Sequence, residues 1–154
     1  MADYNNKWPQ RANEDSSSDL SKEFNSRWIT NGIDEDFIKY AEKVGQALVD
    51  GMLTTSKIRN IYGEIKRIHI NVSKKSDFAS SNPNYASFLL LKAKVAYTEG
   101  RERGNSGVKL FTKIFDKAWT SVVNGKEDAK QMYFENFCKV MEAILAYHRS
   151  KGGR

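Results

Sequence analysis

The sequence predicts an all-α fold, a single-domain bundle of about five helices with a polar N-terminal arm. Its 154 residues suffice for one domain of ordinary size. Across residues 33–154 apolar side chains recur every three or four positions, the period of an amphipathic helix. No segment shows the period-two alternation of a strand, and Gly, Pro, Asn and Ser cluster between the periodic segments. We therefore divide the chain into a flexible polar arm, 1–32, and a helical domain, 33–154.

The arm prediction depends on composition. Asn and Ser are frequent before residue 33, the stretch DSSSDLS is polar, and no apolar period is sustained there. Trp8 and Trp28 are the exceptions. They could anchor the arm on a partner or on the domain, or they could be incidental.

The first two helices have clear start and stop signals. Asp34 can cap a helix that ends at Gly51. The second helix opens at Thr54 or Thr55, both good capping residues, and ends before the polar loop around residues 74–83. The apolar face of the first helix comprises Phe37, Ala41, Val44 and Leu48. That of the second comprises Ile58, Ile61, Tyr62, Ile65, Ile68, His69 and Val72.

Three more helices follow. The third is expected from about Asn84 to Glu102, and it leads into GRERGNSG, a flexible basic loop. The fourth should cover about Val108 to Val123, and Asn124-Gly125 ends it. The fifth should run from about Glu127 to Arg149, with most of its large apolar residues near one face.

Residues that could support catalysis or hold a metal are few. His69 shares the phase of the apolar face of the second helix, so we expect a packed, hydrogen-bonded histidine there. No Cys or His cluster has metal-ligand spacing, and Cys138 has no sequence signature of a nucleophile. No Gly-rich loop of the nucleotide-binding kind is present. We expect a protein that is not an enzyme and has no catalytic residues, metal site or cofactor.

The charge distribution favours a polyanionic partner. Residues 1–36 carry four Lys/Arg and eight Asp/Glu, whereas residues 37–154 carry 21 and 11, a balance of +10. Such a basic domain suits nucleic acid, although solubility alone would also explain it. No apolar run approaches the ~20 residues of a membrane span. The single cysteine and the lack of a visible signal peptide make the cytoplasm the expected compartment.

The second helix carries the most suggestive basic group. Arg59, Lys66 and Arg67 fall on one side of its apolar face, with Gly63 among them leaving room for a backbone or sugar. At its start, N–H groups, three hydroxyls and Lys57 could also meet a phosphate. The alternative is that the hydroxyls only cap the helix and the cations are solvated.

Other basic residues lie on the third and fourth helices. Around the third helix lie Lys92, Lys94, Arg101 and Arg103. The last two belong to a mobile basic loop, which suits contact with a flexible nucleic-acid backbone. Lys109, Lys113 and Lys117 form a stripe that we interpret as a solvated face. The first two helices also outline a helix-turn-helix, which would make the protein a DNA-binding transcription regulator. The second helix, however, offers few base-reading side chains beyond Asn60 and Arg59.

Three blocks of the sequence together resemble one known family. They are LTTSKIRNIYGEIKRI (Leu53 to Ile68), FLLLKAKVAYTEGRE (Phe88 to Glu102) and FENFCKVMEAILAYHRSKGG (Phe134 to Gly153). In this order and spacing they resemble the small subunit of type III-A CRISPR interference complexes, the Csm complexes. The resemblance covers about residues 34–153 and does not include the arm.

The resemblance implies an all-helical, non-catalytic subunit of an RNA-guided antiviral complex. Its copies would stack along the repeated backbone subunits and line the channel that holds guide RNA paired to target RNA. Its partners would be both RNAs, copies of itself, and the large, backbone and capping subunits; it implies no cofactor. The C-terminal block would serve mainly core and subunit contact. The residues of the matching blocks that would meet RNA phosphates or neighbouring subunits are Lys57, Arg59, Lys66, Arg67, Lys92, Lys94 and Arg101.

Overall fold

The computed structural model describes residues 20–75 and 78–154, and within these ranges it contains helices and no strand. The prediction of an all-α fold is therefore confirmed. The helices are α2 (Arg27–Thr30), α3 (Glu35–Asp50), α4 (Thr55–Lys75), α5 (Pro83–Arg101), α6 (Ser106–Val123) and α7 (Lys130–Ser150). No helix in the described part of the chain is long and apolar enough to cross a membrane.

Local capping explains where the helices begin. Asp34 caps α3 as predicted, because its carboxylate accepts a hydrogen bond from the Phe37 N–H at 2.9 Å. The side chain of Asn82 caps α5, whose first residue is a proline. Asn105 caps α6 by accepting from the Val108 N–H. The two asparagine caps place the starts of α5 and α6 slightly earlier than the apolar pattern predicted.

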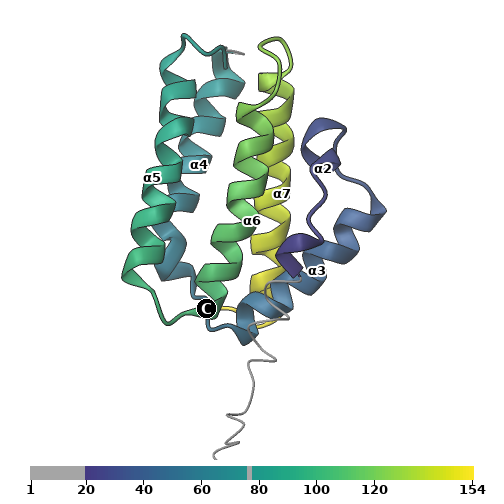
Figure 1. Cartoon of the computed structure of the whole chain (residues 1–154), viewed down its shortest axis with the longest axis vertical. Helices are drawn as coiled ribbons and strands as arrows, with labels where there is room; N and C mark the ends of the chain where they lie inside the picture. The colour runs from purple at the N-terminus through teal and green to yellow at the C-terminus, as the bar shows by residue number, and fades with distance from the viewer. Residues whose placement is uncertain (1–19, 76–77) are drawn as a thin grey trace, which may run out of the picture.

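The helices are arranged around α7 (Figure 1). α4 and α5 form an antiparallel hairpin on one side of the bundle, and α2 and α3 lie on the other. α7 packs against α2, α3, α4 and α6, while α5 packs mainly against α4 and α6. The arrangement leaves the outer side of the α4–α5 hairpin uncovered by any other helix of the described residues.

Aromatic side chains join the hairpin to the rest of the bundle. Phe78, in the connection before α5, stacks on Phe134 of α7 with ring centroids 4.3 Å apart. Phe88 of α5 meets Phe134 and Phe137 edge-on at 5.5 and 5.1 Å. All four rings are almost completely buried, so this cluster holds the hairpin against α7.

The N-terminal boundary differs from the predicted one. Phe24, Trp28 and Ile29 are 8%, 5% and 0% exposed and belong to the main core. The Trp28 indole donates a hydrogen bond to Asp34 at 3.0 Å, and Asn136 of α7 donates one to the Ile29 carbonyl at 2.8 Å. Residues 20–32 thus pack on the helical domain instead of continuing the arm. The sequence of this short polar segment did not predict its packing, because its few apolar residues meet partners far along the chain.

The rest of the predicted arm is a separate matter. Residues 1–19, including Trp8, lie outside the described residues, so the flexible arm there stays a prediction.

Lys117 of α6 donates a hydrogen bond to the Ser21 carbonyl at 2.8 Å. This contact corrects the interpretation of the Lys109, Lys113 and Lys117 stripe as merely solvated, because one of its members anchors the N-terminal segment.

Candidate nucleic-acid interface

The predicted basic flank of α4 borders a groove between α4 and α5. Two adjoining pockets form this groove, with volumes of about 270 and 700 Å³. Asn60 of α4 and Tyr97 and Thr98 of α5 line both pockets, which makes the groove continuous. We call it the α4–α5 groove.

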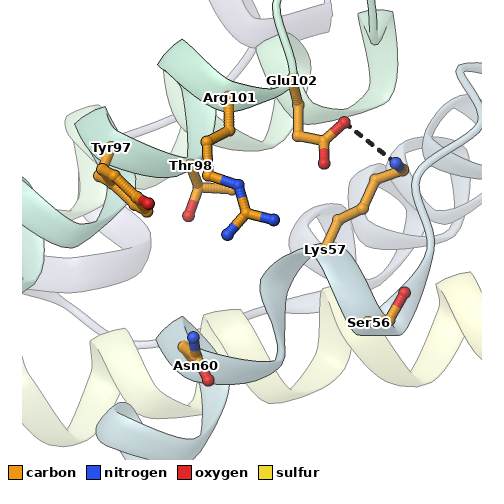
Figure 2. A pocket seen from close by; sticks show the side chains of 7 residues that line it. All are labelled: Ser56, Lys57, Asn60, Tyr97, Thr98, Arg101 and Glu102. Carbon is orange, nitrogen blue, oxygen red and sulfur yellow. Dashed lines mark hydrogen bonds and ion pairs between the residues drawn. The ribbon is translucent and has the colours of Figure 1, made fainter.

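The smaller pocket lies where the start of α4 meets the end of α5. Figure 2 shows side chains converging on it from both helices, with the guanidinium of Arg101 projecting from α5 toward α4. Lys57 closes one end by pairing with Glu102 at 3.0 Å. The Arg101 guanidinium lies 5.7 Å from the centroid of the Tyr97 ring, a cation–π distance. The pocket therefore combines two cations, a carboxylate, an aromatic ring and neutral polar groups.

The larger pocket contains Arg59 and Lys94 on opposite walls, with Glu64 beside them. Glu64 accepts a hydrogen bond from Arg67 Nε at 3.0 Å and lies 3.8 Å from the Lys94 ammonium. The Arg67 hydrogen bond, helped by the nearby charges, lowers the pKa of the Glu64 carboxyl although burial opposes this. A Cβ added at Gly63 would meet nothing within 4 Å, so this part of the groove is open.

The structure brings together four of the seven predicted contact residues, namely Lys57, Arg59, Lys94 and Arg101. Two more, Lys66 and Arg67, continue along the exposed side of α4. The seventh, Lys92, does not line the groove, because its ammonium lies 4.7 Å above the Trp119 ring, toward α6. Of the seven predicted residues, four therefore line the groove, two lie on the exposed side of α4 beside it, and one lies apart from it.

The start of α4 is less available than the sequence suggested. The Thr55 N–H donates a hydrogen bond to the Arg154 carbonyl at 2.8 Å. The hydroxyls of Thr54 and Ser56 lie 3.0 Å apart and hydrogen-bond to each other. Buried His148 donates to the Leu53 carbonyl at 2.8 Å and fixes the connection before the helix. Because these contacts occupy polar groups at the start of α4, they argue against a phosphate site at this end of the helix.

His69 and Cys138, the residues considered for catalysis or metal binding, occupy structural positions. His69 is hydrogen-bonded to Glu135 of α7 at 2.8 Å, but its side chain is 40% exposed, so it lies at the edge of the core and not within it. Burial, with the charges of Glu135 and Glu142, raises the pKa of the Cys138 thiol, which disfavours the reactive thiolate. Among the described residues no group of three or more His, Cys, Asp or Glu is placed to hold a metal ion.

On the α5 wall of the groove, sequence reasoning predicted Lys94 and Arg101 but missed Tyr97 and Thr98. Tyr97 and Thr98 lie between Lys94 and Arg101 at helical spacing, so all four share one side of α5. Glu64 and Glu102 were also missed as partners of the predicted cations. The spacing on α5 was visible in the sequence, but nothing in it told which face of α5 meets α4.

The packing of α4 also bears on the helix-turn-helix alternative. α4 packs on α5 and, less extensively, on α7. Its partner is thus the helix that follows it, whereas a helix-turn-helix pairs the reading helix with the one before it. This arrangement does not support the regulator interpretation.

Comparison with known proteins identifies a family. A family model described as Csm2 Type III-A matches residues 33–154. Among curated proteins, the "CRISPR system Cms protein Csm2" of Enterococcus italicus is 33% identical over 97 residues, covering 62% of this chain and 65% of the relative. The chain thus spans a little less than two thirds of that relative's length. No solved structure matches the chain.

Proposed function

The chain belongs to the Csm2 family of type III-A CRISPR systems, as the three sequence blocks indicated, and from this premise we propose that it is a non-catalytic small subunit of an RNA-guided Csm complex. In this role it contacts the phosphates of guide and target RNA through the α4–α5 groove. It packs on copies of itself and on the large, backbone and capping subunits in the cytoplasm. Its contribution to antiviral defence is to hold RNA, while other subunits perform the chemistry.

The α4–α5 groove is the observation that carries this proposal. Two helices place Lys57, Arg59, Lys94 and Arg101 along one surface, and Lys66 extends the row. Cations on a rigid helical hairpin bind phosphates without reading bases. An RNA-guided complex needs this property, because base pairing with the guide already supplies the sequence specificity.

The cations of this surface are not equivalent. Lys57 pairs with Glu102, and Glu64 attracts both Arg67 and Lys94. Arg59, Lys66 and Arg101 have no ion pair among the described residues, and all three are exposed. Their charge is not offset by a paired carboxylate, so these three residues should contribute most to attracting a phosphate.

The decisive experiment reverses the two of these charges that lie on α4. We expect Arg59→Glu with Lys66→Glu to reduce the guide RNA that copurifies with the protein from its host. For isolated protein and single-stranded RNA, the slope of log K against log salt should fall by about 0.7 for each phosphate that the variant no longer neutralises. The matched control is Lys39→Glu with Lys43→Glu, which makes the same charge change on exposed positions of α3.

The outcomes separate the possible roles. An equal reduction in both double variants would mean that net charge alone attracts RNA and that the groove has no special part. Unchanged RNA retention in the groove variant would indicate a purely structural adaptor within the complex. Recovery of the protein without guide RNA and without other subunits would contradict the proposed function itself.

A further inference from the structure

Two carboxylates make the α4–α5 groove an imperfect phosphate site. Glu102 lines the smaller pocket and Glu64 the larger one. A phosphate deep in either pocket would lie close to one of these negative charges, which opposes binding. However, carboxylates accept hydrogen bonds from amino groups, which nucleobases carry, and from hydroxyls, which ribose carries. The interior of the groove therefore suits the uncharged parts of a nucleotide better than its phosphate.

The same groove contains an exposed aromatic ring. Tyr97 is 67% exposed although it lines both pockets. The Arg101 guanidinium 5.7 Å from its centroid leaves most of the ring surface free. Tyrosine rings and arginine planes are the groups on which proteins stack unpaired bases. Figure 2 shows both side chains bordering the same pocket.

The remaining lining groups can form hydrogen bonds with the edge of a base. The Asn60 amide lines both pockets and is exposed, and it has no hydrogen bond to any residue that the structure describes. It can both donate and accept. With a volume of about 270 Å³, the smaller pocket can admit one small ligand and not a nucleic-acid helix.

We propose that the α4–α5 groove binds one unpaired nucleotide of the RNA, with its base stacked on Tyr97. The base edge faces Asn60 and Glu102 in the smaller pocket, and the flanking phosphates lie at the outer rim of the groove beside Arg59 and Lys94. This inference rests on the proposed function, since it assumes that RNA occupies the groove. It adds that the protein distinguishes an unpaired nucleotide from a continuous duplex.

The test compares two RNA duplexes that differ by a single bulged nucleotide. The bulge carries 2-aminopurine, whose fluorescence falls when the base stacks. Wild-type protein should bind the bulged duplex about ten-fold more tightly than the paired one, which is the typical contribution of one base–aromatic stack. Binding should also quench the fluorescence.

Variants of Tyr97 separate stacking from other effects. Tyr97→Phe keeps the ring and should keep both the preference and the quenching. Tyr97→Leu should abolish both, so that the bulged and paired duplexes bind this variant with equal affinity. Because Tyr97 is mostly exposed, both variants should fold, and circular dichroism would verify this.

Each result has a definite meaning. Equal affinity for the two duplexes, or a preference that survives Tyr97→Leu, would overturn the unpaired-nucleotide site and leave phosphate binding intact. If neither duplex binds in a salt-sensitive way, this inference and the proposed function fail together. A groove that instead holds a protein neighbour would appear as Tyr97→Leu protein that binds both duplexes normally but fails to enter the complex, and this too would overturn the nucleotide site.

Discussion

At the residue scale, the partners of the basic side chains determine how much of their charge is available. Glu64 is the main example, because it lies between Arg67 and Lys94 and offsets part of both charges. Its hydrogen bond with Arg67 holds the pKa of its carboxyl below the usual range. The stabilisation from this contact is therefore present at neutral pH and is lost as the pH falls through the lowered pKa.

Replacing Glu64 should strengthen RNA binding. Glu64→Gln frees the charges of Arg67 and Lys94, so we expect tighter binding and a steeper salt dependence than in wild type. Titration of labelled RNA at several salt concentrations would measure both. The control is Glu42→Gln on α3, which removes a carboxylate that is more exposed than Glu64 and is paired with one lysine, Lys151, at 3.0 Å. An equal gain in this control would show that only net charge matters.

At the element scale, two helical glycines illustrate different constraints. A Cβ at Gly45 of α3 would lie 2.6 Å from the Tyr147 Cβ and 2.7 Å from its backbone, so α3 and α7 approach closely there. Gly63 of α4 faces open space. The first glycine serves packing between helices, whereas the second lowers the stability of its own helix without any packing benefit.

Alanine substitutions should therefore have opposite effects on stability. Gly45→Ala should destabilise the fold by about 1–3 kcal/mol because the backbones must separate. Gly63→Ala should stabilise it by up to about 1 kcal/mol. Urea unfolding followed by circular dichroism would measure both changes. If RNA approaches α4 at Gly63, the more stable variant should also bind RNA more weakly, and unchanged binding would exclude a close approach there.

At the scale of the whole molecule, the N-terminal segment determines how far the domain extends. Trp28 packs against Phe24, Phe37 and Tyr40, and its indole hydrogen-bonds to the residue that caps α3. The Tyr40 hydroxyl in turn donates to the Leu20 carbonyl at 2.9 Å. The folded unit thus includes residues that precede the family match, which begins at residue 33.

Trp28 should consequently be essential for stability and not for RNA binding. We expect Trp28→Ala to lower the free energy of unfolding by about 3–5 kcal/mol, as for other buried large-to-small changes. Trp28→Phe, which removes the hydrogen bond to Asp34 but keeps a ring, should cost less, with about 1 kcal/mol from the hydrogen bond. Thermal and urea unfolding would test this ranking. Equal stability of wild type and Trp28→Ala would mean that residues 20–32 are not part of the folded domain.

The sequence by itself determined the local features of this protein. The helical period, the Asp34 cap, the basic side of α4 and the family blocks all depend on residues close together in the chain. The tertiary structure alone decided which residues meet. Lys57 reaches Glu102 across 45 positions, and Asn136 reaches Ile29 across 107. Such long-range packing decides whether a cation is neutralised, which side of α5 completes the groove, and where the domain begins. The helical period of the sequence does not encode these contacts.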